Sequence, residues 1–582
     1  MKKNKIIRCF LLITLVSIIP LLGACKKNNQ DIASEIPSPT PTEALNEEPD
    51  KGKEKYANDW FDAYPIQMGK VNITTEDIFK EDFESGQTNL NGRGSATVDI
   101  VNTHANEGVS SLYVTERAAP WNGAEVNITD LLDANCTYVI SAYVFYEEGP
   151  DSVQIDCKIE RNGNQYLDFA SSSAKKGQWT HITGSIIIAE DTETATLYFE
   201  TDYKSEDLID FYIDDISITK ETSMAERGDI PALKDVYKNH FTVGVAATVN
   251  EISPDRQELI RHQFNTLTPG NELKADAVLD YNTCKSDPKY DDNPAISFSA
   301  VEPLLDFAKK NNMKVRGHTL IWHSQTPRWF FAENYSKADD APLVSRELML
   351  KRMENYIKNV FDYVNDNYPD LFYAWDVVNE AINPSEANTD TNPQGFRIEE
   401  SYYYQVVGPD FIEKSFEFAR KYANENIKLF YNDYNTEDSS KRSYIYDLIK
   451  DLSIKGLIDG VGLQSHLSVD SPSLLDVESS IRKYAELDLE IHLTEIDMGT
   501  NKNTEEEYLK QASRYKRLFT FLINFVENGT ADITNVTFWG LSDDISWLNK
   551  PGQPSYPLLF DRHLIQKPAF WGVLLHPDIT LY

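Results

Sequence analysis

The chain has 582 residues, a formal net charge of −36 and 41% hydrophobic residues. This length exceeds a single ordinary domain and supplies apolar side chains for more than one core, so we expect at least two domains. A charge of this sign and size repels nucleic acid and anionic membrane surfaces, which excludes nucleic acid as an expected partner. We interpret most of the acidic residues as the solvated surface of an exported protein.

Residues 1–24 have the features of an export signal. A basic segment from Met1 to Arg8 precedes a short apolar stretch, Cys9 to Gly23, that is too short for a comfortable membrane span. The small residues that end at Cys25 resemble a bacterial lipoprotein signal, which implies cleavage that leaves Cys25 acylated. We therefore predict an exported, cell-surface lipoprotein of a bacterium. The alternative is ordinary signal cleavage, which gives a secreted protein with a free Cys25 thiol.

Residues 25–77 are predicted to form a tether. Between residue 26 and about residue 56 there are almost no large apolar side chains, so this segment cannot offset the entropy cost of folding. Beyond it only Cys136, Cys157 and Cys284 remain, an odd number that argues against a disulfide framework. Cys136 and Cys157 can pair only if neighbouring strands bring them close. Buried free thiols are at least as consistent with their apolar contexts.

Between residues 78 and 220 the sequence consists of short runs in which apolar and polar residues alternate. The clearest runs are Ala96–Val101, Ser111–Thr115, Tyr138–Phe145, Val153–Ile159, Thr196–Glu200 and Phe211–Ile218. Many short strands of period two, separated by turn residues, predict an all-β sandwich of the jelly-roll type.

The predicted sandwich resembles carbohydrate-binding module family 22. The resemblance is carried by Phe83–Gly86, Arg93–Gly94, Arg117–Gly123 and the closing segment Tyr212–Asp215. It implies a xylan-binding groove lined by Arg93, Trp121, Tyr166 and Glu200, in which aromatic faces cover the apolar surface of sugar rings. Modules of this kind often hold a structural calcium, and the candidate ligands are Glu84, Asp214 and Asp215.

From residue 229 to residue 582 predicted strands alternate with helices. The strands are Phe241–Ala247, Thr266–Thr268, Lys314–Trp322, Ala374–Val378, Lys428–Asn432, Gly460–Gln464, Leu489–Thr494 and Val536–Gly540. Amphipathic helices are expected between them, such as Pro254–Phe264 after the capping residue Ser253, and Glu505–Glu527. Eight alternations over about 350 residues predict an α/β fold, the (β/α)8 TIM barrel.

Two glutamates, Glu380 and Glu495, end predicted strands of this barrel. Reactive groups of such barrels lie where strands end and loops begin. Two carboxylates can break a glycosidic bond when one is protonated to release the leaving oxygen and the other is ionised. The sequence therefore predicts a glycosidase site, with metal ligation or ion pairing by these acids as the alternative.

The barrel region resembles glycoside hydrolase family 10, the endo-β-1,4-xylanases. The matching motifs follow one another in order: Asn271–Lys274, Gly317–Gln325, Trp375–Glu380, Tyr431–Asn435, Gly462–His466, Leu493–Asp497 and Trp539–Trp547. The resemblance implies a retaining hydrolysis in which Glu380 is the general acid/base and Glu495 is the nucleophile, with no catalytic cofactor.

The resemblance also implies supporting residues. Asn379 is expected to hydrogen-bond the sugar hydroxyl beside the reacting carbon, while His466 and Asp497 keep the nucleophile ionised and oriented. The expected sugar contacts are Asn271, Glu272, Lys274, His318, Trp322, Gln325, Tyr431, Asn432, Gln464, Trp539 and Trp547. His318 and His323 lie five residues apart on a predicted strand and so face opposite sides, which argues against a shared metal ion.

These features together predict a monomeric, lipid-anchored endo-xylanase that binds xylan and xylo-oligosaccharides. Two alternatives remain: cleavage of another β-1,4-glycan, such as cellulose or mixed glucan, and non-catalytic glycan capture at the cell surface. The presence of both carboxylates and their partners counts against simple capture. Tyr402–Tyr404 stands where the family commonly has a tryptophan, so the preference for decorated chains stays open.

Overall fold

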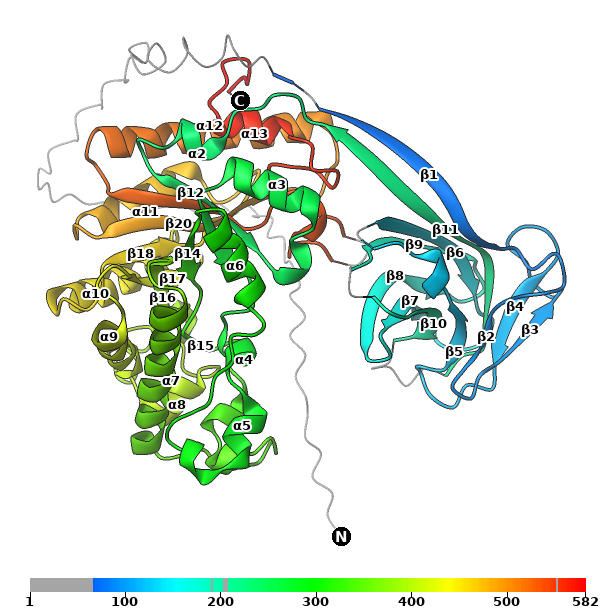
Figure 1. Ribbon diagram of the computed structural model, residues 1–582, viewed down its shortest axis with the longest axis horizontal. Coiled ribbons are helices and arrows are strands. Elements are labelled where there is room, and N and C mark those ends of the chain that lie inside the picture. The colour runs from blue at the N-terminus through cyan, green and yellow to red at the C-terminus, as the bar shows by residue number, and fades with distance from the viewer. Residues whose placement is uncertain are drawn as a thin grey trace, which may run out of the picture. The chain divides into compact units, whose positions relative to one another are not determined.

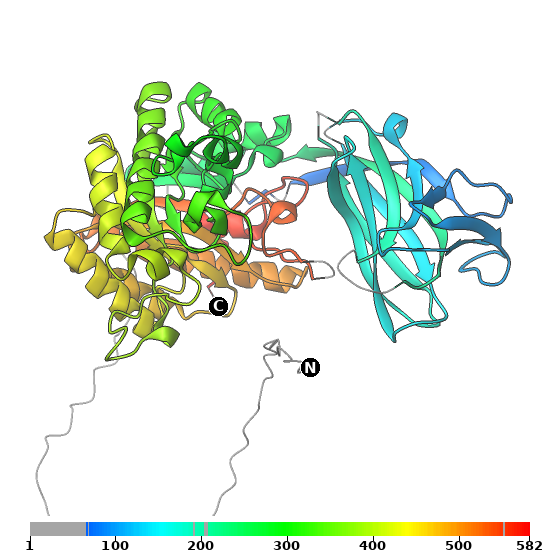
Figure 2. The ribbon, with the colours of Figure 1, turned by 90° about the horizontal axis from the view of Figure 1, so that it is seen from below.

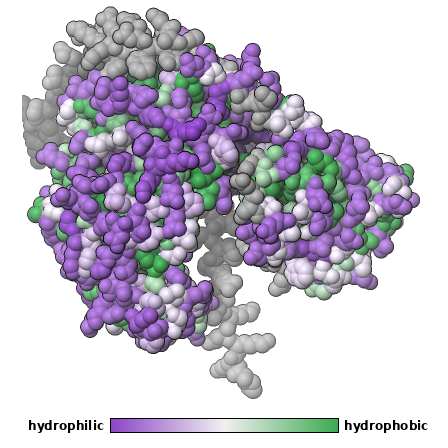
Figure 3. Space-filling view, in the orientation of Figure 1, coloured by the Kyte–Doolittle hydropathy of each residue, from purple (hydrophilic) through white to green (hydrophobic). Residues whose placement is uncertain are grey.

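The computed structural model describes residues 66–67, 69–134, 136–189, 192–202, 208–550 and 553–581. The predicted export signal, Cys25 and most of the predicted tether lie outside these ranges. Within them, no helix combines the length and the apolar character needed to cross a membrane. Figure 3 shows a mostly hydrophilic face, as expected from the excess of acidic residues.

The first folded part is a sandwich of two antiparallel sheets (Figure 1). One sheet has the order β3-β4-β11-β6-β9, with β1 paired to β11, and the other has the order β2-β5-β10-β7-β8. The strands are β1 Lys70–Glu81, β2 Asn91–Arg93, β3 Thr97–Val101, β4 Ser111–Thr115, β5 Gly123–Asn127, β6 Thr137–Phe145, β7 Ser152–Arg161, β8 Gln165–Lys175, β9 Thr180–Ile187, β10 Ala195–Thr201 and β11 Phe211–Glu226. The predicted all-β module is therefore confirmed.

Alternation explains which sandwich strands the sequence reveals. In β6 every second side chain, including Tyr138, Ile140 and Ala142, is buried between the sheets, and this strand was predicted. Strands β1, β2, β5, β8 and β9 were not predicted. Several lack a regular apolar face: β8 carries three consecutive serines, and β1 is largely exposed. Cys136, Cys157 and Cys284 are free thiols in the described chain.

The first and last strands of the sandwich form a long two-stranded ribbon. β1 pairs with β11 from Lys70 opposite Glu226 to Glu81 opposite Ile216, with a bulge between Asp77 and Phe79. Figure 1 shows this ribbon as the paired blue and green strands. The chain therefore enters and leaves the sandwich through neighbouring strands.

The second folded part is a closed parallel barrel, as predicted (Figures 1 and 2). Its ring runs β14-β13-β12-β21-β20-β18-β17-β16 and is closed by pairing of β14 with β16. The strands are β12 Thr242–Ala247, β13 Thr266–Pro269, β14 Lys314–Gly317, β16 Phe372–Asn379, β17 Lys428–Asp433, β18 Gly460–Leu463, β20 Glu490–Gly499 and β21 Ile533–Phe538. Two short strands extend the ring: β15 Ile321–Trp322 beside β16, and β19 His466–Ser468 beside β20.

Helices separate these strands along the chain, and the longer ones lie around the barrel (Figure 1). They are α2 Leu233–Val236, α3 Pro254–Gln263, α4 Ala275–Val278, α5 Tyr281–Ser286, α6 Glu302–Lys310, α7 Arg346–Asn367, α8 Tyr402–Val407, α9 Phe411–Tyr422, α10 Ser439–Ile454, α11 Leu474–Ala485, α12 Glu505–Glu527 and α13 Pro568–Val573. The predicted helix 505–527 is confirmed residue for residue. Thr504 caps it by accepting the backbone N–H of Glu507, and three glutamates occupy its first turn, where the helix dipole favours negative charge.

Candidate active site

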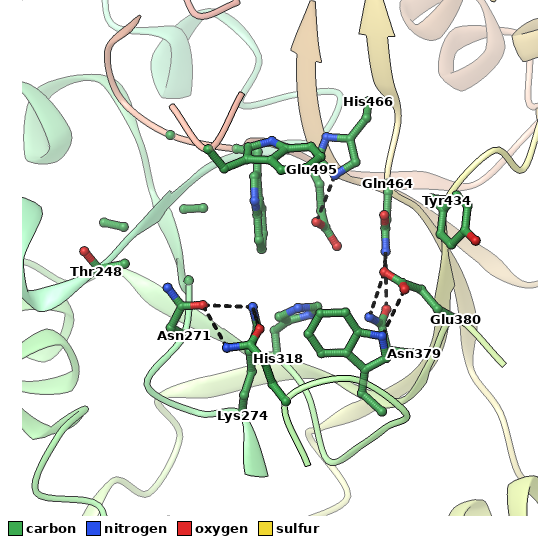
Figure 4. A pocket seen from close by; sticks show the side chains of 18 of the residues that line it. Thr248, Asn271, Lys274, His318, Asn379, Glu380, Tyr434, Gln464, His466 and Glu495 are labelled. Carbon is green, nitrogen blue, oxygen red and sulfur yellow. Dashed lines mark hydrogen bonds and ion pairs between the residues drawn. The ribbon is translucent and has the colours of Figure 1, made fainter. Parts of the chain in front are cut away.

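The barrel holds a cavity of about 510 Å³ at the ends of its strands. Figure 4 shows Glu380 and Glu495 pointing into it together with Gln464, while Asn271, Lys274 and His318 lie across from them. The lining residues are Ala246, Ala247, Thr248, Glu251, Gly270, Asn271, Lys274, His318, Trp322, Gln325, Asn379, Glu380, Tyr434, Asn435, Gln464, His466, Glu495, Trp539, Gly540, Ile545 and Trp547. Most of the predicted site residues are therefore brought together.

Glu380 directly follows β16 and receives three neutral donors. Trp322 Nε1 donates to its Oε2 at 2.9 Å, Gln464 Nε2 donates to its Oε1 at 2.8 Å, and Asn379 Nδ2 donates to the same oxygen at 3.2 Å. Burial raises the pKa of Glu380, and the carboxylates of Asp433 and Glu495 add to that increase. A raised pKa favours the protonated form, as a general acid requires.

Glu495 lies within β20 and has a more polar set of partners. Asn432 Nδ2 donates to its Oε1 at 2.8 Å, and His466 Nε2 lies 3.3 Å from its Oε2. Burial opposes ionisation of Glu495, but the hydrogen bonds and positive charge around it outweigh burial and lower its pKa. The two glutamates thus have pKa values shifted in opposite directions, which favours one acid and one carboxylate at the same pH.

His466 connects the second glutamate to a further acid. Its Nδ1 lies 3.0 Å from Asp497 Oδ2, and Trp547 Nε1 donates to the same oxygen at 2.8 Å. Burial lowers the pKa of His466, but the carboxylates of Asp497 and Glu495 raise it to about 10. His466 is therefore cationic at neutral pH and favours the ionised form of Glu495. The short strand β19 pairs with the last part of β20, and in this pairing His466 lies opposite Asp497.

Side-chain amides link the two glutamates. Asn432 Nδ2 donates both to Glu495 Oε1 and, at 3.0 Å, to Asn379 Oδ1, while Asn379 Nδ2 donates to Glu380. Thr494 Oγ1 in turn donates to Asn432 Oδ1 at 2.7 Å, which fixes the orientation of that amide. The relative placement of the carboxyl groups is thus set by neutral side chains.

A buried charged network supports His318 from inside the barrel. His318 Nδ1 lies 2.9 Å from Asp376 Oδ2, and Arg316 Nε donates to that oxygen at 3.0 Å. Arg316 also contacts His492, whose Nε2 lies 2.7 Å from Thr534 Oγ1. Because Asp376 and Arg316 are buried together, each offsets the desolvation cost of the other.

The predicted sugar contacts on one side of the cavity contact one another. Lys274 Nζ donates to Asn271 Oδ1 at 3.0 Å and to Gln325 Oε1 at 2.9 Å, and it lies 5.0 Å from the centre of the Trp322 ring. Trp539 and Trp547 line the cavity, and Trp547 is 56% exposed. Exposed ring faces and fixed polar groups at one cavity wall are typical of a carbohydrate site.

Three predicted sugar contacts are corrected by the structure. Tyr431 and Asn432 are 0% exposed and do not line the cavity. Asn432 instead binds the carboxylate of Glu495, and Tyr431 lies behind the cavity wall. Glu272 is also absent from the lining, because its carboxylate accepts the backbone N–H groups of Val249 and Asn271.

The cavity includes polar residues that were not predicted, among them Thr248, Glu251, Tyr434 and Asn435. Tyr434 and Asn435 directly follow β17, so their position after a strand end was the available signal. Thr248 and Glu251 form a capping box after β12. Their spacing, threonine followed three residues later by glutamate, is a sequence signature of a helix start.

In the sandwich, Arg93 lies at the centre of a charged face of the sheet that contains β2, β5, β10 and β7. It forms ion pairs with Glu125 at 2.6 Å and Glu160 at 2.5 Å, and its guanidinium lies 4.0 Å from the centre of the Tyr198 ring. These residues come together because Tyr198 is in register with Glu125 on one side and with Lys158 on the other. Tyr198 was not predicted.

Glu200 lies on the same face, buried against a cation. Lys158 Nζ lies 3.0 Å from Glu200 and 3.3 Å from Asp156. By contrast, Trp121 is 49% exposed and Tyr166 is 61% exposed. Tyr166 is opposite Glu160 across β7 and β8, which places it on this face. The predicted groove residues thus include two charged residues that form ion pairs and two aromatic rings that are exposed to solvent.

The three calcium candidates all bind one loop of the sandwich. Asp214 Oδ2 accepts the backbone N–H of Asn106 at 2.7 Å, Asp215 Oδ2 accepts the Asn106 side chain at 2.8 Å, and Glu84 Oε1 accepts the N–H groups of Val109 and Ser110. Burial raises the pKa of Asp214 to about 6. Within the described ranges, no group of three or more acidic, histidine or cysteine side chains is arranged to hold a metal ion.

Comparison with family models gives two matches. Residues 232–575 match the family described as glycosyl hydrolase family 10, and residues 75–206 match a carbohydrate binding domain. The first match covers more than half of the chain and contains every lining residue of the cavity. The second match covers most of the sandwich.

Similar proteins extend over both parts of the chain. Endo-1,4-β-xylanase A of Thermotoga maritima is 35% identical over 85% of this chain and 46% of its own length. Endo-1,4-β-xylanase A of Caldicellulosiruptor sp. strain Rt8B.4 is 34% identical over 86% of this chain and 71% of its own length. The chain spans about half the length of most of the curated relatives it matches.

A solved structure has the same order of parts. It contains the CBM22-1 and GH10 modules of the N-terminal endo-1,4-β-D-xylanase 10B of Clostridium thermocellum, complexed with xylohexaose. It is 31% identical, covers 86% of this chain and 97% of its own chain, and superposes with a TM-score of 0.56.

Proposed function

This chain belongs to glycosyl hydrolase family 10, and from that membership and the geometry of its cavity we propose that it is a retaining endo-1,4-β-xylanase. The observation that carries the proposal is the pair of glutamates in one cavity with pKa values shifted in opposite directions. The xylanase relatives that match both parts of the chain support xylan as the substrate.

In the first step, Glu495 attacks the anomeric carbon of the sugar and forms a covalent glycosyl-enzyme. Glu380 gives its proton to the departing glycosidic oxygen as that bond breaks, so the leaving chain departs as an alcohol. The donors from His466 and Asn432 keep Glu495 ionised before the attack. A retaining mechanism requires the two carboxyl groups to be about 5 to 5.5 Å apart.

In the second step, Glu380 acts as a general base. It removes a proton from water, the water oxygen attacks the anomeric carbon, and the bond to Glu495 breaks. Departure of Glu495 as a carboxylate is favoured by the same cationic His466 that lowers its pKa. Two inversions at one carbon leave the product with the starting configuration.

The walls of the cavity are assigned to substrate binding. Asn271, Lys274 and Gln325 form one hydrogen-bonded group that supplies donors and acceptors for sugar hydroxyls. The rings of Trp322, Trp539 and Trp547 supply apolar surfaces for sugar rings. Tyr434 and Asn435 extend the wall beyond Glu380, so we assign them to the leaving-group side.

For the sandwich we propose a xylan-binding module of family 22. The match to a carbohydrate binding domain and the solved structure with CBM22-1 and GH10 modules support this assignment. Trp121 and Tyr166 are expected to stack on sugar rings, while Arg93 and Glu200, held by their ion pairs, offer fixed polar groups. Tyr198, which lies under Arg93, is added to this set.

A structural calcium in the sandwich is the second proposal for this module. The candidate carboxylates already accept hydrogen bonds from the loop at Asn106 to Ser110, and they do not form a group of three. Buried Asp214 is the strongest of the three candidates. Thermal denaturation with calcium and with a chelator tests it: calcium binding raises the melting temperature of the sandwich by mass action.

Export and anchoring are proposed on the sequence alone. The basic and apolar N-terminal segment and the run that ends at Cys25 support export with acylation of that cysteine, and secretion without a lipid is the alternative. Metabolic labelling with a fatty acid, with Cys25→Ser as the control, distinguishes the two. A monomer is proposed by default and is tested by light scattering.

The activity is tested by reducing-end release from xylan and from a mixed-linkage β-glucan, with a chain that begins after residue 25. Release from xylan alone, lost in both Glu380→Ala and Glu495→Ala, supports the endo-xylanase and both catalytic assignments. Release from the glucan instead indicates another β-1,4-glycanase. Folded protein that binds xylan without cleaving either polymer overturns the enzymatic proposal in favour of glycan capture.

A further inference from the structure

The backbone of Glu380 adopts an unusual conformation. Its φ angle is +56°, in the left-handed region that residues other than glycine seldom adopt. Such a conformation persists only when the surrounding structure holds it firmly. The side chain of a general acid at this position is therefore aimed by whatever fixes the backbone of residues 380 and 381.

Four hydrogen bonds hold these two residues. The N–H of Glu380 donates to the carbonyl of Asn432 at 2.9 Å, and its own carbonyl accepts Arg397 Nε at 3.2 Å. The N–H of Ala381 donates to the Tyr431 hydroxyl at 3.0 Å, and the carbonyl of Ala381 accepts the backbone N–H of Arg397 at 2.8 Å. Two of the four bonds come from side chains, those of Tyr431 and Arg397.

The Tyr431 hydroxyl is itself fixed in direction. It donates to Asp433 Oδ2 and therefore presents a lone pair to the N–H of Ala381. Asp433 Oδ1 forms an ion pair with Lys441 Nζ at 2.7 Å. Tyr431, Asp433 and Lys441 are all buried, so this chain of contacts is shielded from water.

Arg397 connects the same backbone to the cavity wall. In addition to the carbonyl of Glu380, it contacts Glu400 through Nη1 at 2.6 Å and the hydroxyl of Tyr434 through Nη2 at 2.8 Å. Tyr434 lines the cavity, whereas Tyr431 and Arg397 do not. One buried guanidinium therefore fixes both the general acid and a wall residue on the proposed leaving-group side.

We infer that Tyr431 and Arg397 are positioning residues for the proton-transfer step, because they hold the left-handed backbone that aims Glu380 at the leaving oxygen. The inference rests on the proposed role of Glu380 as the general acid. Tyr431 and Arg397 donate or accept hydrogen bonds at the backbone of residues 380 and 381, whereas the side chains that bind the carboxylate of Glu495 are Asn432 and His466. Loss of Tyr431 or Arg397 is therefore expected to impair protonation of the leaving group more than attack on the sugar.

Leaving-group dependence separates these two effects. The dinitrophenolate of a dinitrophenyl β-xylobioside is a good leaving group and departs without help from an acid. The phenolate of an unsubstituted phenyl β-xylobioside has a conjugate acid of pKa about 10, so it needs a proton from the general acid. For Tyr431→Phe we expect kcat/KM to fall about 10- to 100-fold on the phenyl substrate, because misplacement of a general acid removes its contribution. On the dinitrophenyl substrate the change is expected to stay within about twofold.

Tyr237→Phe is the matched control. Tyr237 is also fully buried, and its hydroxyl donates to the carbonyl of Val573, outside the cavity lining. This variant loses a buried hydroxyl without the contact to Ala381, so both substrates should keep the wild-type ratio of rates. Arg397→Lys is the second test variant, because lysine keeps the charge but cannot reproduce the fork of donors to Glu380 and Tyr434.

The outcomes are distinct. A larger loss on the phenyl substrate in Tyr431→Phe and Arg397→Lys, with equal melting temperatures, supports the positioning role. Equal losses on both substrates, or no loss, in variants that remain folded overturn it while leaving the proposed function intact. A wild-type protein that cleaves neither substrate overturns the proposed function, and the inference with it.

Discussion

The predicted groove face of the sandwich and the acid Glu380 of the barrel cavity differ in how their buried charged groups are partnered. On the sandwich face Arg93 is paired with Glu125 and Glu160, and Glu200 is paired with Lys158. In the barrel cavity Glu380 receives only neutral donors, from Trp322, Gln464 and Asn379. The charges of the binding face are thus neutralised locally, whereas the side chains that donate hydrogen bonds to Glu380 in the described part of the chain carry no charge.

This difference follows from the chemistry that each region is proposed to perform. A sugar-binding face needs fixed dipoles and ring surfaces, and ion pairs between charged side chains hold those groups in place. A retaining site needs two carboxyl groups in different protonation states, and a cation beside each would ionise both. Only Glu495 has a cationic partner, His466.

The same substitution in each region gives the largest contrast. Glu495→Gln removes the proposed nucleophile, and we expect kcat/KM on a soluble xylo-oligosaccharide to fall about 10^5-fold. Glu200→Gln leaves the cavity unchanged, so its kcat/KM is expected to stay within about twofold of wild type. Initial rates with xylotetraose measure both. A large loss in Glu200→Gln would show that the sandwich charges act in the reaction.

Removal of Lys158 tests whether the ion pairs on the sandwich face stabilise the module. Lys158→Met leaves Glu200 and Asp156, which are both buried, without their shared partner. We expect the sandwich to lose about 3 kcal/mol of stability, at the low end for a broken buried pair. Scanning calorimetry measures the unfolding of the sandwich, and kinetics of the barrel are expected to be unchanged. The pair of Lys220 and Asp133, in which the aspartate is 70% exposed, supplies the control variant Lys220→Met.

The pH profile tests the effect of the cation His466 on the pKa of Glu495. Activity is lost as pH falls through the pKa of Glu495, which is lowered, and as pH rises through the pKa of Glu380, which is raised. In His466→Gln the cation is gone, so the pKa of Glu495 rises and the acidic limb of kcat/KM moves to higher pH. The alkaline limb is expected to stay in place. An unmoved acidic limb would contradict the assigned charge of His466.

Loss of an exposed ring gives the smallest expected effect. Trp121→Ala is expected to weaken binding to insoluble xylan about tenfold, because one stacking surface is removed while the ion-paired residues remain. Binding is measured by depletion in a Glu495→Gln background, which prevents digestion of the polymer. The matched variant is Trp179→Ala. It removes a ring that packs near Phe145 of β6, in the sheet that does not carry the proposed groove. Equal weakening in both variants would contradict the assigned groove.

Much of the barrel was predictable because its strands are buried runs and its reactive groups follow them. Glu380 lies directly after β16, and several other lining residues, such as Thr248 and Tyr434, also directly follow strands. The sequence did not reveal which face of β17 points inward. Tyr431 and Asp433 share one face of that strand and pack behind the wall, while Asn432 between them reaches the nucleophile.

In the sandwich, the sequence did not predict which strands pair or how they are aligned. Lys158 and Tyr198 are far apart in sequence, and their place beside Glu200 and Arg93 depends on how β7 pairs with β10. Alternation predicts that a strand exists but not its partner or its alignment. Exposed strands such as β1 and serine-rich strands such as β8 also lack the apolar face that marks a strand in sequence.

The β1 and β11 ribbon makes the sandwich a removable unit of the gene. Lys70 and Glu226 face each other in the ladder, so the backbone enters and leaves about 5 Å apart. Deletion of the intervening codons therefore leaves two ends that a short turn can join, and insertion at that position needs no long linker. This pairing of the module's ends suits the exchange of whole binding modules during evolution, since the recipient chain has almost no gap to bridge.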